Sequence, residues 1–269
     1  MQKRITYLSM LYVLFIVLLF ASGSLSGILS TAVYFLSFAL PVAIGIYLTR
    51  RDGEGRTEYL TIEKDEVKKT IPLIAPTISI VIFTSYLTSL AIYYLTGRVN
   101  SVDLGDSFVP ALISHALLPA ILEEALFRYL PLRMLASRSK RGAIIISAFF
   151  FAFAHQDLFT IPYAFMAGVI LMAIDIATDS VLPSIIIHFI NNAISVGVIV
   201  FSDNPIFAPV MYSVLGILTV ISIVLIVIKN REYRYMLSDA FEEGEKYRLT
   251  LDILCFACLM LIVACVKLF

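Results

Sequence analysis

The sequence predicts an all-α fold, a polytopic bundle of about eight or nine transmembrane helices. Hydrophobic residues make up 60% of the 269 positions and charged residues 15%, whereas soluble domains average about 45–50% and about 25%. Apolar runs of about 20 residues, the length of a helix that crosses the hydrocarbon core, recur along the chain. The short alternating segments of a β-barrel are absent from the sequence. A lipid-exposed backbone must satisfy its own hydrogen bonds, so these runs are expected to be helical.

Nine apolar runs divide what we interpret as a single transmembrane domain, residues 1–269. Most of the runs can cross the membrane, but the fifth is short and fits a partial or tilted crossing. The runs are Ile5–Ser22, Ile28–Leu48, Ile71–Thr96, Phe108–Phe127, Ala143–Ala154, Leu158–Ala177, Val181–Phe201, Ile206–Ile228 and Leu249–Leu268.

The positions of basic residues predict the orientation of the chain. With single crossings throughout, every basic cluster falls on the same side of the membrane, so the N-terminus and residues 51–70 and 229–248 are expected in the cytoplasm. The second connection fits either an amphipathic helix on the membrane surface or a solvated connector. The basic residues are Lys3 and Arg4 before the first run, Arg50, Arg51, Arg56, Lys64, Lys68 and Lys69 after the second, Arg128, Arg133, Arg138, Lys140 and Arg141 after the fourth, and Lys229, Arg231, Arg234, Lys246 and Arg248 after the eighth.

The charge balance and the cysteine content narrow the possible classes of function. The 20 basic and 20 acidic residues cancel, which argues against a nucleic-acid partner. Cys255, Cys258 and Cys265 lie in the last run with no other soft ligand nearby, so we interpret them as small apolar fillers rather than a metal or redox site. No cleavable signal peptide is evident, and the first run is expected to be a retained span.

Two adjacent acids and an arginine end an apolar run at Ile121–Arg128. An acid inside a membrane is a functional-site hypothesis. Residues four apart are helical neighbours, so Glu124 can pair with Arg128, while Glu123 lies about 100° around the helix and is uncommitted. A carboxylate in the dry interior suits a general base. The alternative is an acid pair that reaches cytoplasmic water, because both acids are expected within about two turns of the boundary.

Two histidines and an amide lie in later apolar runs. His188 and Asn192 share one stripe of a helix, where an imidazole and an amide can donate together to an oxyanion. The alternative is an interhelical hydrogen-bonded pair. His155 ends an aromatic-rich run and on its own fits a residue at the membrane interface.

Other polar residues in the apolar runs are assigned structural roles. His115 has no acid or amide beside it. Asp175 and Asp179 are expected to cap helix ends or face cytoplasmic water. Asn191 is expected to be a packing or capping group.

Three motifs occur in order: Glu-Glu-x-x-x-Arg at 123–128, Phe-x-x-x-His at 151–155 and His-x-x-x-Asn at 188–192. Together they resemble the CAAX-protease and bacteriocin-processing (CPBP, or ABI) family of intramembrane glutamate proteases, which includes the Ras-converting CAAX endopeptidases. The resemblance covers about 108–200, which we take as the catalytic core. It includes the approach to the last motif, residues 179–188.

The resemblance implies a cavity that opens to the cytosol, and a metal-independent endopeptidase without a cofactor. Glu123 and His155 would position and activate a water, and His188 and Asn192 would stabilise the tetrahedral oxyanion. The substrate would be a membrane-associated peptide or protein, cut near its end, with membrane lipid as the other partner. The positions that match the bracing residues of the family are Glu124 and Arg128.

Two alternatives remain open. Glu123, His155 and His188 could ligate a catalytic zinc, although no His-Glu-x-x-His helix is present. An ion-coupled, non-enzymatic membrane protein could use the acids as a relay, although no paired Gly/Pro-interrupted spans repeat in the two halves. A prokaryotic plasma membrane is the expected location. The sequence predicts neither the physiological substrate nor the oligomeric state.

One geometric difficulty accompanies this interpretation. A helix rising from the cytoplasmic boundary near Arg141 places His155 about 20 Å along its axis. Glu123 is expected to be much shallower. The fifth helix would therefore have to begin outside the membrane, tilt or be broken.

Overall fold

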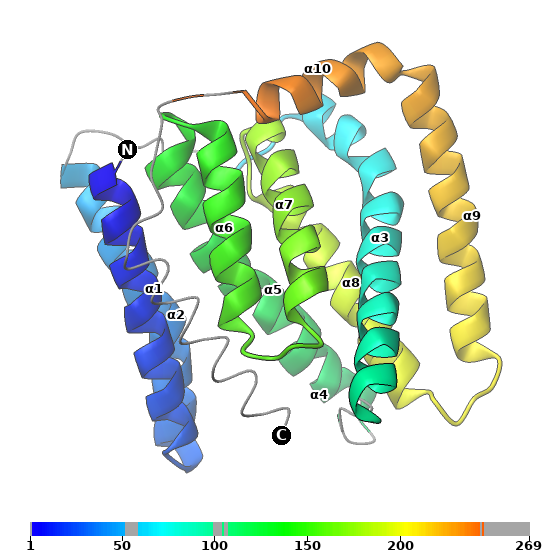
Figure 1. The fold of residues 1–269 in the computed structure, drawn as a ribbon, viewed down its shortest axis with the longest axis horizontal. Helices are drawn as coiled ribbons and strands as arrows, with labels where there is room; N and C mark the ends of the chain where they lie inside the picture. Colours follow the sequence, from blue (N-terminus) through cyan, green and yellow to red (C-terminus); the bar gives the residue numbers. More distant parts are fainter. Residues whose placement is uncertain (1, 52–58, 99–103, 105–106, 243, 245–269) are drawn as a thin grey trace.

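The computed structural model describes residues 2–51, 59–98, 104, 107–242 and 244. These residues form a helical bundle and contain no strand, which confirms the predicted fold class (Figure 1). Seven of the helices are long and apolar enough to cross a membrane.

Each of the first eight predicted runs coincides with one helix; the ninth, Leu249–Leu268, lies outside the described residues. The fourth helix is built from five consecutive pieces, three of them π-helical (η). The elements are α1 (Gln2–Gly23), α2 (Gly27–Arg51), α3 (Lys64–Thr96), α4 (Phe108–Leu112), η1 (Ile113–Leu117), α5 (Leu118–Glu124), η2 (Ala125–Tyr129), η3 (Leu132–Ala136), α6 (Lys140–Ala154), α7 (Ile161–Thr178), α8 (Leu182–Val200), α9 (Phe207–Ile228) and α10 (Asn230–Ala240).

The fourth helix is longer than predicted, because it continues to Ala136 rather than ending near Phe127. Arg128 and Arg133, expected in a cytoplasmic loop, are 0% and 2% exposed inside the bundle. Arg133 can be buried because its Nε donates to Thr49 Oγ1 at 2.6 Å. Arginines that resembled the end of a span are therefore buried within it, where Arg128 pairs with Glu124 and Arg133 donates to a hydroxyl.

This extension corrects the expected depth of the acids. Glu123 lies 13 positions before the helix end at Ala136, about 20 Å of helical rise. The 15 residues of α6 return about 22 Å from the same end, and His155 follows directly. Glu123 therefore lies far deeper than two turns, at a depth similar to that of His155, and the geometric difficulty disappears.

Aromatic packing joins α1 to the fourth helix. The Tyr12 ring stacks on Phe127 with centroids 5.2 Å apart, and it also lies 4.3 Å from the ring of Phe150 on α6. Its hydroxyl donates to the carbonyl oxygen of Leu126 at 3.5 Å. These contacts hold the helix that carries both acids against its neighbours.

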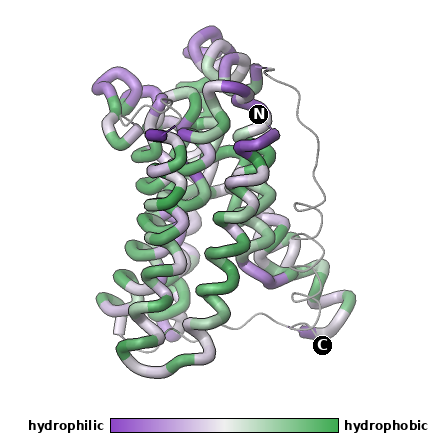
Figure 2. The backbone as a smooth tube through the Cα atoms, turned by 90° about the vertical axis from the view of Figure 1, so that its left-hand side faces the viewer, coloured by the Kyte–Doolittle hydropathy of each residue, from purple (hydrophilic) through white to green (hydrophobic). Residues whose placement is uncertain are grey.

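Hydrophilic residues gather at the end of the bundle that carries the N-terminus and α10 (Figure 2). The described part of the predicted connection 229–248 is largely helical, and α10 lies across this end (Figure 1). Tyr233 donates to the carbonyl oxygen of Lys69 at 3.2 Å, and Lys140 Nζ lies 2.7 Å from Asp239 Oδ1. These bonds tie α10 to the polar ends of α3 and α6.

The close contact between α6 and α7 depends on Gly168. A Cβ at this position would lie 2.7 Å from the Cα of Ala148, whereas a Cβ at Gly216 on α9 would meet no atom within 4 Å. We expect Gly168→Ala to lower the free energy of unfolding by about 1–3 kcal/mol, because the added methyl group overpacks this contact. Thermal unfolding of the purified protein in detergent measures the change. Gly216→Ala is the matched control and should be neutral or stabilising; equal stability of both variants would contradict the packing argument.

Candidate active site

A cavity of about 210 Å³ lies between α3, the fourth helix, α6, α7 and α8. The four predicted catalytic residues all line it, although they come from three separate helices. They are Glu123, His155, His188 and Asn192.

Glu123 faces two imidazole rings. Its Oε2 lies 3.9 Å from His155 Nε2 and 4.0 Å from His188 Nε2. This oxygen is buried and forms no hydrogen bond with any residue in the described part of the chain. Both distances exceed those of direct hydrogen bonds, and separations of this size are commonly bridged by a water molecule.

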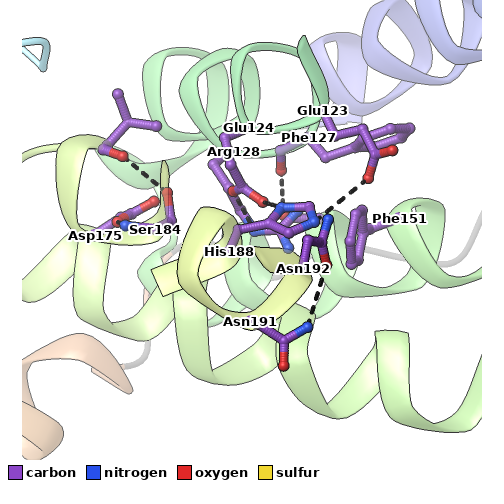
Figure 3. Close-up of polar contacts among 12 residues, drawn as sticks. Glu123, Glu124, Phe127, Arg128, Phe151, Asp175, Ser184, His188, Asn191 and Asn192 are labelled. Atoms are coloured by element: carbon purple, nitrogen blue, oxygen red, sulfur yellow. Dashed lines mark hydrogen bonds and ion pairs between the residues drawn. The ribbon is translucent and has the colours of Figure 1, made fainter. Parts of the chain in front are cut away.

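Glu124 is fully buried and has two partners. Its Oε2 lies 3.3 Å from Arg128 Nε, so the pairing that the four-residue spacing predicts is present. Its Oε1 lies 2.6 Å from His188 Nδ1, a contact the sequence did not predict (Figure 3). Since Nδ1 is occupied, the Nε2 of His188 is the nitrogen available on the Glu123 side.

A backbone hydrogen bond to Nδ1 orients the ring of His155, as the contact with Glu124 orients that of His188. This residue caps the C-terminal end of α6, and its Nδ1 lies 2.8 Å from the carbonyl oxygen of Phe151. Because a carbonyl oxygen only accepts, Nδ1 carries the proton and a neutral ring keeps Nε2 as an acceptor. Gln156 follows with a φ of 52°, a left-handed conformation that ends the helix.

Phe151 lies at the centre of this arrangement. Its ring makes edge contacts with His155 and His188, with centroids 4.9 and 5.9 Å apart. The Arg128 guanidinium carbon lies 4.2 Å from the centre of the same ring, within the range of a cation–π interaction. The aromatic residue of the second motif thus contacts both histidines and the buried arginine.

The two asparagines of α8 are linked. Asn191 Nδ2 donates to Asn192 Oδ1 at 3.2 Å (Figure 3). Because this oxygen is engaged, the amide nitrogen of Asn192 is the group left for the cavity. Asn191 also lines the cavity, so its assignment as an ordinary packing group was incomplete.

Asp175 lies inside the bundle, contrary to the expectation of a water-facing residue, but it meets the other expectation, that of a helix cap, because it accepts from a first-turn N–H of α8. It is fully buried, and its Oδ1 accepts from the backbone N–H of Ser184 at 3.2 Å. A single acid in an otherwise apolar span was the signal that could have identified it. Asp179 is the left-handed C-cap residue of α7, as expected. His115, also treated as structural, lies on the cavity wall.

The described residues include no group of three or more His, Cys, Asp or Glu side chains placed to hold a metal ion. Glu123, His155 and His188, the alternative zinc ligands, therefore do not form such a group.

Residues 105–194 match the family model described as type II CAAX prenyl endopeptidase Rce1-like. The chain contains an Rce1-like domain. The match encloses all three motifs and confirms the resemblance to the CPBP family. It indicates a membrane-embedded protease of the CAAX type. No curated protein and no solved structure matches the chain significantly.

Removing one member of the buried ion pair should destabilise the Rce1-like domain. In Arg128→Leu the Glu124 carboxylate keeps its hydrogen bond to His188 but loses its guanidinium partner inside the bundle. We expect a loss of about 3–5 kcal/mol in the free energy of unfolding. Denaturant unfolding in detergent measures it. Glu123→Gln, which alters an acid on the cavity wall, should change stability far less; similar losses in both variants would show that the pair has no special structural role.

Proposed function

We propose that this protein is an intramembrane glutamate endopeptidase that hydrolyses a peptide bond near the end of a membrane-associated peptide or protein. The observation that carries the proposal is the position of Glu123 Oε2, 3.9 and 4.0 Å from the Nε2 atoms of two histidines. The match of residues 105–194 to the CAAX prenyl endopeptidase family supports the reaction class.

In the proposed mechanism, Glu123 and His155 hold and activate a water. Both groups can accept a proton, because Glu123 Oε2 forms no hydrogen bond with a described residue and His155 donates through Nδ1 to a carbonyl oxygen. As the water attacks the scissile carbonyl carbon, Glu123 takes its proton. General-base assistance of this kind typically contributes about 10²–10⁴ in rate.

The attack converts the carbonyl oxygen into an oxyanion, which His188 and Asn192 stabilise. His188 lies between the carboxylates of Glu124 and Glu123; carrying both ring protons, it can donate to Glu124 from Nδ1 and to the oxyanion from Nε2. Asn192 donates from its amide nitrogen. Each such donor is typically worth about 10²–10³ in rate.

The tetrahedral intermediate collapses when Glu123 passes its proton to the leaving amine. Water is the nucleophile, so no acyl-enzyme forms. Glu124 and Arg128 fix the orientation of His188 and take no part in proton transfer. The reaction consumes one water and releases a new carboxyl terminus and a new amino terminus.

We also propose that the protein lies in a prokaryotic plasma membrane with its N-terminus in the cytoplasm. The hydrophilic end of the bundle, which carries the N-terminus and α10, supports this orientation (Figure 2). Prenylated C-terminal peptides, which the name of the matched family describes, are one candidate substrate class.

Replacement of the proposed general base tests the mechanism. We expect Glu123→Gln to reduce cleavage at least about a hundredfold, because an amide cannot accept the proton. Quantitative mass spectrometry of membrane peptides from cells producing wild type or variant measures it. Asp179→Asn makes the same acid-to-amide change at the left-handed C-cap of α7, which asparagine tolerates, and should cleave normally. Turnover by Glu123→Gln at the wild-type rate would rule out the mechanism.

The proposed reaction needs no metal. Purified protein dialysed against a strong chelator, with its metal content checked by elemental analysis, should keep its full cleavage rate. Loss of activity that zinc restores would favour the zinc peptidase instead, with Glu123, His155 and His188 as ligands.

A further inference from the structure

A second hollow, of about 780 Å³, adjoins the active-site cavity between α3, α8 and α9. Val81, His115, Tyr163, Asn191 and Asn192 line both spaces. We call the second space the α3–α9 groove. Because these five residues line both spaces, the groove lies directly beside the active-site cavity that Glu123 lines.

The α3 wall of the groove carries serine hydroxyls without partners. Ser85 and Ser89 line the groove, are half-buried and form no hydrogen bond with another described residue. Two threonines on the same helix differ: Thr84 donates to the carbonyl oxygen of Ile80 at 2.7 Å, and Thr88 to that of Thr84 at 2.8 Å. The serine hydroxyls thus remain available to a ligand, whereas the threonine hydroxyls are used within the helix.

An unpaired acceptor lies where the groove meets the active-site cavity. Asn191 lines both spaces, and its Oδ1 is buried without a hydrogen-bond partner among the described residues. Its amide nitrogen is already bound to Asn192. The groove therefore presents one acceptor beside the proposed oxyanion site and two hydroxyls, each able to donate or accept, further along.

These unpaired hydrogen-bonding groups fit a peptide as the ligand of the groove and do not fit a lipid chain. An extended peptide carries an N–H and a C=O at each residue, and each polar group left unpaired in an apolar environment costs several kcal/mol. Serine hydroxyls and an amide oxygen can satisfy such groups. An acyl or prenyl chain has no donor or acceptor, and it would leave these side chains unpaired.

We propose that the α3–α9 groove binds the substrate itself, as an extended peptide that continues from the scissile bond. This inference rests on the proposed function, since it takes Glu123 as the site of cleavage. Asn191 accepts from a main-chain N–H next to the cut bond, and Ser85 and Ser89 pair with main-chain groups further along.

The direction of the groove narrows the class of substrate. On α3 the two serines follow Val81 toward Thr96, and on α8 the groove residue Ser195 follows Asn192 toward Val200. Both directions lead away from the end of the bundle that carries α10 (Figure 1). The bound chain therefore extends into the half of the membrane opposite the hydrophilic end. The substrate is a peptide segment embedded in the membrane and locally unwound, not a cytoplasmic tail whose only embedded part is a lipid.

The positions of the cut bonds test this substrate class. Peptides that differ between cells producing the full-length wild type and Glu123→Gln give the cleavage sites directly. We expect each cut bond to lie within or directly beside an apolar segment, with the chain continuing into that segment. Cuts confined to polar tails bearing a lipid would overturn the groove proposal but leave the proposed function intact. Identical peptide populations would instead overturn the proposed function.

A pair of double variants tests the hydroxyls with a substrate found in that comparison. Ser85→Ala/Ser89→Ala should lower kcat/KM about tenfold, mainly by raising KM, because two binding hydrogen bonds are lost. Thr84→Val/Thr88→Val removes two hydroxyls from the same helix turns and should stay within about twofold of wild type, since these bond only to their own helix.

An unchanged KM in the serine variant, while Glu123→Gln is inactive, would overturn the groove proposal. If the thermal stability of the serine variant is then also reduced, the groove is instead a packing surface for another part of the chain or for lipid.

Discussion

The architecture of the site depends on one buried carboxylate, Glu124. A charge without water is costly unless it is paired and hydrogen-bonded. Here Arg128 lies one helical turn away at 3.3 Å and His188 lies at 2.6 Å. The ion pair with Arg128 compensates the charge of Glu124 within the fourth helix. The contact with His188 joins that helix to α8. Because Glu124 occupies Nδ1 of His188, it also determines which ring nitrogen is directed toward Glu123. Stability of the bundle and orientation of the proposed oxyanion donor therefore share one cause.

The adjacent acid has the opposite environment. Glu123 lies about 100° around the same helix, where the neighbours of its Oε2 are two imidazoles beyond direct hydrogen-bonding distance. A carboxylate that is paired with a guanidinium and bonded to an imidazole, as Glu124 is, is a poor base. One beside a proton-accepting ring at water-bridging distance can take a proton from water. Two identical side chains at consecutive positions thus suit different tasks, and the helical geometry alone separates them.

The sequence was sufficient for the helices, the three motifs and the Glu124–Arg128 pair, because these follow from run length and the four-residue repeat of a helix. The sequence was misleading about how deep in the bundle the charged residues of the fourth helix lie. Arg128 and Arg133 resemble the end of a span, yet both are buried, and hydropathy cannot distinguish a solvated charge from one paired inside a bundle. The bond between Glu124 and His188 joins residues 64 positions apart, which no local pattern encodes. The partner of Asp175, the Ser184 backbone, likewise becomes apparent only when α7 and α8 are packed.

The depth of Glu123 limits how a substrate can reach it. About 20 Å of helix separates this residue from the hydrophilic end of the bundle. An extended chain advances about 3.3–3.6 Å per residue, so roughly six residues of peptide would have to enter from that end. In the α3–α9 groove, the two serines and Asn191 provide hydrogen-bonding groups at membrane depth on the opposite side of the proposed cleavage point. A peptide already embedded in the membrane would need only to unwind beside α3, and its exposed main chain would find partners there. In the proposed binding mode, access from within the membrane therefore leaves fewer main-chain groups unpaired than access from the hydrophilic end.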